Sequence, residues 1–152
     1  RRLMDIGRCV HYHAVNNLLP DGRVIDTAGA GPSGTFGDDK RIEVFEPPYL
    51  FRGVRPRIDS ISSTDLTRGG SVTINVSFAS SATEVALVGM RAATHWQDGG
   101  PSRLLSVPFT QTGAALSVSV PSDENRYMSG YYILFVMADD IPSNGQIVKI
   151  PR

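Results

Sequence analysis

Two of the three histidines in this sequence stand in one short segment together with a cysteine and a tyrosine. The segment reads Cys9-Val10-His11-Tyr12-His13. In a regular strand, alternation would place Cys9, His11 and His13 on one face and Tyr12 on the other. Thiolate and imidazole suit zinc or copper, so this face is one candidate metal site. The alternative is that both histidines are ordinary strand residues, because two or three donors on one strand seldom complete a site.

The third histidine, His95, is expected in a loop between two strands, where ligands are commonly found. It would supply a further donor, whereas a single loop histidine is more often simply exposed. The adjacent Trp96 allows two interpretations: a platform on which a sugar stacks, or a partly buried anchor for the loop. We favour the anchor.

Short β-strands must position these residues. Polar and apolar residues alternate along residues 71–77, which places Val72, Ile74 and Val76 on one face. Turn signals rich in Gly, Pro, Asn and Asp, such as residues 141–145, separate further strand-like runs. Seven strands in all predict an all-β fold, an immunoglobulin-like β-sandwich. The other six strands are expected at residues 56–61, 83–90, 103–109, 115–120, 131–137 and 146–150.

Residues 1–47 predict a separate unit. The turn Pro20-Asp21-Gly22 favours a hairpin. Three strands alone expose both edges and cannot bury both faces, so this unit needs something to pack against. A stretch rich in proline and aromatic residues marks the boundary, which divides the chain into residues 1–47 and 48–152. Strands of the first unit are expected at residues 9–16, 23–27 and 41–45.

The composition argues against several functional classes. Fifteen Lys and Arg balance fifteen Asp and Glu among 152 residues, which disfavours binding to nucleic acid or to anionic membranes. No apolar run is long enough to cross a bilayer, and no signal-peptide pattern begins the chain. The single cysteine, Cys9, excludes an internal disulfide. Three nearby arginines, Arg52, Arg55 and Arg57, are expected to form a solvated linker face.

Seven short motifs follow one another along residues 8–151. In order, they are Tyr12-His13, residues 18–24 (LLPDGRV), residues 43–50 (EVFEPPYL), Arg55-Pro56, Thr94-His95, residues 130–136 (GYYILFV) and Pro142-Ser143. Together, in this order and at this spacing, they resemble the galactose oxidase and glyoxal oxidase family. The resemblance implies a secreted, extracellular copper-radical oxidase, with a kelch-type propeller followed by an early-set, immunoglobulin-like sandwich.

The resemblance also implies roles for individual residues. Tyr12, His13 and His95 would bind copper, with Tyr12 as the axial ligand and catalytic base. The radical cofactor, a tyrosine crosslinked to a cysteine, is expected only in the upstream region. Residues 1–47 would be strands of the last, incomplete propeller blade, and residues 48–152 the early-set sandwich.

The implied reaction of the complete protein is oxidation of a primary alcohol or aldehyde by O₂, which yields H₂O₂. The chain alone is expected to be inactive, so whether the parent protein is an enzyme depends on its upstream residues. The partner of this chain would be the upstream propeller, and the substrate would be a carbohydrate or a small alcohol or aldehyde. Binding to nucleic acid or to a membrane is not expected. The competing hypothesis is a non-catalytic sandwich module that binds carbohydrate or a partner protein.

Overall fold

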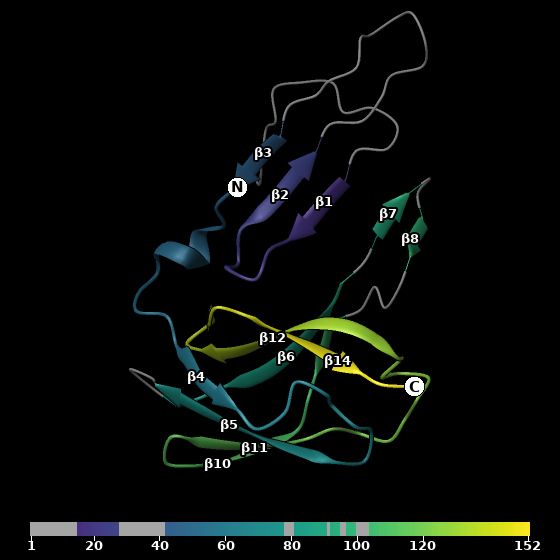
Figure 1. The fold of residues 1–152 in the computed structure, drawn as a ribbon. Helices are drawn as coiled ribbons and strands as arrows, with labels where there is room; N and C mark the ends of the chain where they lie inside the picture. The colour runs from purple at the N-terminus through teal and green to yellow at the C-terminus, as the bar shows by residue number, and fades with distance from the viewer. Residues whose placement is uncertain (1–14, 28–41, 78–80, 91, 95–96, 100–103) are drawn as a thin grey trace, which may run out of the picture.

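Strands dominate the computed structural model, which describes residues 15–27, 42–77, 81–90, 92–94, 97–99 and 104–152 (Figure 1). The only helical element among these residues is a short 3-10 helix, η1 (Pro48–Phe51). In this part of the chain, no helix has the length and hydrophobicity needed to cross a membrane. The all-β prediction is confirmed.

Two antiparallel sheets form the sandwich. The four-stranded sheet has the order β10-β11-β5-β4, and the five-stranded sheet has the order β13-β12-β6-β9 with β14 also paired to β12. In the first sheet the strands are β4 (Arg57–Ile61), β5 (Ser71–Ser77), β10 (Phe109–Thr112) and β11 (Ala115–Ser119). In the second they are β6 (Glu84–Gly89), β9 (Leu104–Ser106), β12 (Gly130–Ala138), β13 (Ile141–Pro142) and β14 (Gln146–Ile150).

The core lies between these two sheets. Val72, Ile74 and Val76 of β5 are buried and alternate with exposed polar residues, as the sequence pattern predicts. From the opposite sheet, Tyr132 and Leu134 of β12 enter the same cluster. Burial of these apolar side chains from both sheets supplies the main driving force for folding. The sandwich prediction is confirmed.

A separate three-stranded sheet precedes the sandwich. It consists of β1 (Val15–Leu18), β2 (Val24–Thr27) and β3 (Ile42–Phe45), in that order. The predicted hairpin joins β1 and β2, with Leu18 paired to Val24 across the turn. Figure 1 shows this sheet on the side of β12 and β6, opposite β10 and β11.

Strand β12 is buried on both faces. Tyr132, Leu134 and Val136 point into the sandwich core, whereas Ile133 and Phe135 are buried outside that cluster. Strands of this kind are nearly continuous apolar runs, which explains why residues 131–138 form the longest apolar run of the sequence. The outer face of this sheet is where the preceding hairpin lies.

Three local features differ from the sequence-based expectations. The strand predicted at residues 103–109 is the shorter β9, and β10, which begins at Phe109, is a further strand that the sequence did not predict. Of the turn predicted at residues 141–145, residues 143–145 do separate β13 from β14. An additional turn lies earlier, at Asp139-Asp140, where both residues have positive φ (50° and 60°), as a type I′ hairpin turn requires. Ile141–Pro142 is consequently the short strand β13. A second hairpin, β7 (Ala92–Thr94) and β8 (Gln97–Gly99), was not predicted.

Candidate functional site

The three predicted copper ligands, Tyr12, His13 and His95, lie outside the residues that the structure describes. The alternative ligands Cys9 and His11 also lie outside them. Among the described residues, no three His, Cys, Asp or Glu side chains lie close enough together to hold a metal ion. The candidate site is therefore defined by the described residues next to these positions in the chain.

Two strands lead directly to the candidate ligands. β1 begins at Val15, two residues after His13, and β7 ends at Thr94, directly before His95. Cα atoms of β1 and β7 lie within 8 Å of each other. Figure 1 shows that β1 starts, and β7 ends, on the same side of the molecule, away from the sandwich. Residues 95 and 96, the latter Trp96, connect Thr94 to its pairing partner Gln97 and lie outside the described residues.

Arg55 connects the β1–β2 hairpin to the sandwich. Its Nη1 donates a hydrogen bond to the backbone carbonyl of Asp21, in the turn between β1 and β2, at 2.7 Å. Its Nε and Nη2 donate to the carbonyls of Pro142 and Ser143, at 2.9 and 2.8 Å. A planar guanidinium with fixed donor directions suits several acceptors arranged around it. We call Arg55 and these three carbonyl groups the Arg55 junction.

The interpretation of Arg55 as part of a solvated linker face is wrong. Arg55 is half-buried, whereas Arg52 and Arg57 are exposed as predicted. Burial lowers the pKa of the Arg55 guanidinium, and the nearby Asp21 carboxylate opposes this shift. Because an arginine stays protonated in proteins, its three hydrogen bonds are charge-assisted.

Two further hydrogen bonds hold the β1–β2 turn in place. The hydroxyl of Tyr49, in η1, donates to the Gly22 carbonyl at 2.5 Å, and the Gly145 N–H donates to the Pro20 carbonyl at 2.7 Å. Burial raises the pKa of Tyr49, which keeps its hydroxyl protonated as a donor. Gly22 has a φ of +87°, and a Cβ there would lie 3.2 Å from Nη2 of Arg55. The turn therefore requires glycine at this position.

An ion pair stiffens the same turn from within. Nε of Arg23 donates to Oδ2 of Asp21 at 2.7 Å, and the Arg23 backbone N–H donates to Oδ1 at 3.0 Å. The hydrogen bond from the Arg23 side chain is the main reason that the pKa of Asp21 is lowered below its usual 3.8. The side chains of Arg23 and Asp21 are 42% and 41% exposed, so solvent screens the ion pair. Its effect on stability is therefore small.

This lowered pKa gives an expected pH dependence. The stabilisation by Asp21 is present above its ordinary pKa of 3.8 and is lost as the pH falls through the lower pKa of the folded protein. We therefore expect Asp21→Asn to destabilise the protein slightly at neutral pH, and this difference to disappear in acid. Unfolding free energies of both proteins between pH 7 and pH 2 measure it. A difference that stays constant over this range would contradict the assignment.

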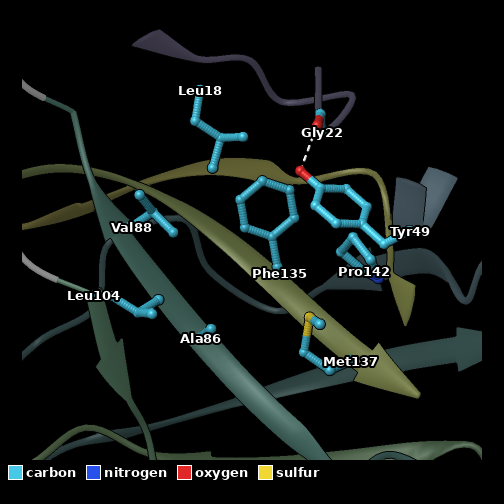
Figure 2. A pocket seen from close by; sticks show the side chains of 9 residues that line it. All are labelled: Leu18, Gly22, Tyr49, Ala86, Val88, Leu104, Phe135, Met137 and Pro142. Atoms are coloured by element: carbon cyan, nitrogen blue, oxygen red, sulfur yellow. Dashed lines mark hydrogen bonds between the residues drawn. The ribbon is translucent and has the colours of Figure 1, made fainter. Parts of the chain in front are cut away.

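Apolar surface surrounds these polar contacts. A cavity of about 280 Å³ lies between the hairpin, η1 and the outer face of β6 and β12, with Phe135 and Tyr49 on its wall (Figure 2). A second cavity, of about 360 Å³, lies beside it between Pro20, Ile25 and Ile133. The described residues that line the two cavities include no charged side chain. The hairpin thus covers an apolar sheet face that would otherwise meet solvent.

Comparison with known proteins assigns the family. The family model of the galactose oxidase-like early set domain matches residues 55–150, which is more than half of the chain. This chain belongs to the galactose oxidase-like early set family. The match begins at Arg55 and includes the described parts of both sheets of the sandwich.

Several curated proteins are similar to this chain. A galactose oxidase of Gibberella zeae is 32% identical over 93% of the chain and 21% of its own length. The aldehyde oxidase GLOX of Vitis pseudoreticulata is 32% identical over 91% of the chain and 29% of its own length. A WSC domain-containing protein of Arthroderma benhamiae is 30% identical over 91% of the chain and 15% of its own length. The chain therefore spans less than a third of the length of these relatives.

A solved structure supports the same assignment. It is described as a novel fungal alcohol oxidase with catalytic diversity among the AA5 family, in complex with copper. It matches 93% of this chain and 31% of its own chain, with a TM-score of 0.82 and 25% identity. The predicted relationship to galactose oxidase and glyoxal oxidase and the early-set fold are both confirmed.

Sequence reasoning missed the Arg55 junction of the early set domain. Four of the motifs that carry the family resemblance meet at this junction and at the adjacent hydrogen bond from Tyr49 to Gly22: residues 18–24, residues 43–50, Arg55-Pro56 and Pro142-Ser143. Nothing in their spacing indicates that they touch, because the acceptors around Arg55 are backbone carbonyls, which every residue has. The available signal was that four motifs carry the family resemblance although none of them contains a predicted metal ligand.

Proposed function

We propose that this chain is the C-terminal part of a copper-radical oxidase-like protein and that it supplies three copper ligands, Tyr12, His13 and His95. The observation that carries the proposal is the contact between β1 and β7. The chain reaches His13 two residues before β1 and His95 directly after β7. Because consecutive Cα atoms are about 3.8 Å apart, these connections are short enough for a phenolate and two imidazoles to converge on one ion.

The chemistry of this donor set suits copper. Copper(II) favours imidazole nitrogens in a tetragonal arrangement with a weaker axial ligand. Bound copper, with a crosslinked tyrosine–cysteine radical in the upstream part, would accept the electrons removed from the substrate. His13 and His95 would hold the metal, and the Tyr12 phenolate would take the hydroxyl proton of the alcohol. The overall reaction converts RCH₂OH and O₂ into RCHO and H₂O₂, and a hydrated aldehyde would give an acid in the same way.

The first three strands favour a further part of the same protein that packs against them. Ile42 and Val44 of β3 have 65% and 47% of their area exposed among the described residues. Exposed apolar side chains on an edge strand favour burial against further structure. We assign residues 1–47 to the last blade of a kelch-type propeller and residues 48–152 to the early-set sandwich. On this model the complete protein acts outside the cell on a carbohydrate or a small alcohol or aldehyde, and the chain alone is inactive.

Copper binding by the full-length protein tests the proposal. We expect stoichiometric copper(II) with nitrogen hyperfine structure in electron paramagnetic resonance. His95→Ala should weaken binding by at least about tenfold, since even partners outside the ligand shell contribute this much to metal affinity. Titration of the metal-free protein with copper(II) provides the affinity.

Cys9→Ser and His11→Ala are the matched controls. Both should leave the copper affinity unchanged, whereas the alternative site formed by Cys9, His11 and His13 predicts a loss in each. Absence of specific copper binding in a demonstrably folded protein would overturn the proposal and leave a non-catalytic binding module.

A further inference from the structure

We propose that Arg55 is a positioning residue for the copper site, through its hold on the turn between β1 and β2. This inference rests on the proposed function, because it concerns the geometry of Tyr12, His13 and His95. Arg55 itself lies in the segment between η1 and β4. Its role is to hold β1, which follows Tyr12 and His13, in a fixed position relative to the sandwich. From the sandwich the chain continues to His95.

The first step of the argument is that Arg55 bridges two parts of the molecule. One of its hydrogen bonds ends on the carbonyl of Asp21 in the turn, and two end on the carbonyls of Pro142 and Ser143 beside β12. Ser143 is itself fixed in the sandwich: it is fully buried, and its Oγ accepts a hydrogen bond from the Val136 N–H at 3.0 Å. The turn is therefore attached to β12 through Arg55 and Ser143.

The second step is that the turn controls the position of β1. Four residue pairs, from Leu18 opposite Val24 to Val15 opposite Thr27, connect the turn to the first residue of β1, which lies two residues after His13. A strand rises about 3.3 Å per residue and transmits a displacement along its length. A shift of the turn relative to the sandwich therefore also moves the chain next to Tyr12 and His13.

The third step is that the other ligand-bearing segment starts from the same sheet. β6 pairs with β12 along its length, from Glu84 opposite Met137 to Gly89 opposite Tyr132. Only Met90 and residue 91 separate β6 from β7, which ends next to His95. Arg55 thus ties β1, which follows Tyr12 and His13 in the chain, to the sheet from which the chain continues to β7 and His95. A misplacement of about 1 Å in such a site is enough to impair its chemistry.

The apolar contacts beside Arg55 cannot fix this register alone. The two cavities, about 280 and 360 Å³, show that the hairpin and the outer face of the sheet pack without filling the space between them. Apolar contact is also non-directional, so it permits sliding. Directional hydrogen bonds supply the missing constraint. Arg55 makes three of them from one planar cation, and Tyr49 and Gly145 each add one to the same turn.

Arg55→Met in the full-length protein, with Arg57→Met as the matched control, tests this inference. The Arg57 side chain is 74% exposed, and its ion pair within the described part of the chain is local, with Asp59 two residues further along β4. We expect Arg55→Met to change the copper(II) hyperfine splitting and to weaken copper binding about tenfold, as losses outside the ligand shell do. Arg57→Met should keep the spectrum and affinity of the unsubstituted protein.

Arg55→Lys is the conservative second variant. It retains the charge but not the planar fork, so we expect a spectrum and an affinity between those of the unsubstituted protein and Arg55→Met. If Arg55→Met fails to fold, Arg55→Lys decides. A folded Arg55 variant with unchanged spectrum and affinity overturns the inference and leaves the proposed function intact. If the unsubstituted protein binds no copper, the proposed function fails and the inference fails with it.

Discussion

Replacement of Gly145 by alanine is expected to destabilise the protein by about 3 kcal/mol, the upper part of the usual cost of overpacking. A Cβ on Gly145 would overlap Cγ2 of Ile133 and lie 2.9 Å from Cε1 of Phe135, both on the covered face of β12. The backbone must move to relieve these contacts. That movement also disturbs the 2.7 Å hydrogen bond from the Gly145 N–H to the Pro20 carbonyl.

Thermal unfolding provides the measurement. A loss of this size lowers Tm by roughly 6–12 °C in a protein of this length. Gly53→Ala is the matched control, because a Cβ there would meet Cδ1 of Ile141 at 3.4 Å, an ordinary contact. An equal Tm for the two variants would show that the region around Gly145 has space that the structure does not indicate.

Tyr132→Ala is expected to cost about 3–5 kcal/mol, as for other large aromatic residues removed from a core. Tyr132 is fully buried in the sandwich core. Its hydroxyl donates a 2.7 Å hydrogen bond to the Met128 carbonyl, four residues earlier in the chain. Alanine therefore creates a large cavity and also leaves the Met128 carbonyl without this donor. Tyr132→Phe, which removes only the hydroxyl, should cost about 1 kcal/mol.

The neighbouring tyrosine provides an internal control. Tyr131 lies on the opposite face of β12 and is 57% exposed, so Tyr131→Ala should change the free energy of unfolding by less than about 0.5 kcal/mol. Denaturant titration of the three variants separates the two positions. Similar losses at Tyr131 and Tyr132 would mean that the alternation along β12 is assigned to the wrong faces.

Long strands could be predicted from the sequence, and short ones could not. The expected bounds 71–77 and 146–150 are those of β5 and β14, because each strand has enough residues to show an alternating pattern. The strands β7, β8 and β13 have three, three and two residues. Such strands are defined by their pairing partners, which a local pattern does not contain.

The burial of β12 on both faces explains a further difference between pattern and structure. The sequence predicted a strand at residues 131–137, but not that two separate layers cover this strand. Tyr132 faces the sandwich core, and Phe135 faces the hairpin. Hydrophobic runs identify a doubly covered strand but do not identify what covers each face.

The candidate ligands could be named from motifs, whereas the contacts that surround them could not. Tyr12, His13 and His95 remain predictions, because they lie outside the described residues. The Arg55 junction became visible only in three dimensions, since its three acceptors lie 34, 87 and 88 residues from Arg55 in the chain. A single arginine in a linker carries no local signal that distinguishes it from solvated neighbours such as Arg52.

The double cover of β12 also limits how this domain can be inherited. A gene fragment that started at residue 48 would encode the sandwich without Leu18 and Ile25, which line the cavities over Ile133 and Phe135. It would also leave Arg55 without its acceptor on Asp21. Recombination could therefore not move the sandwich between proteins as an independent module at little cost. We therefore expect the sandwich to be inherited together with the hairpin that precedes it.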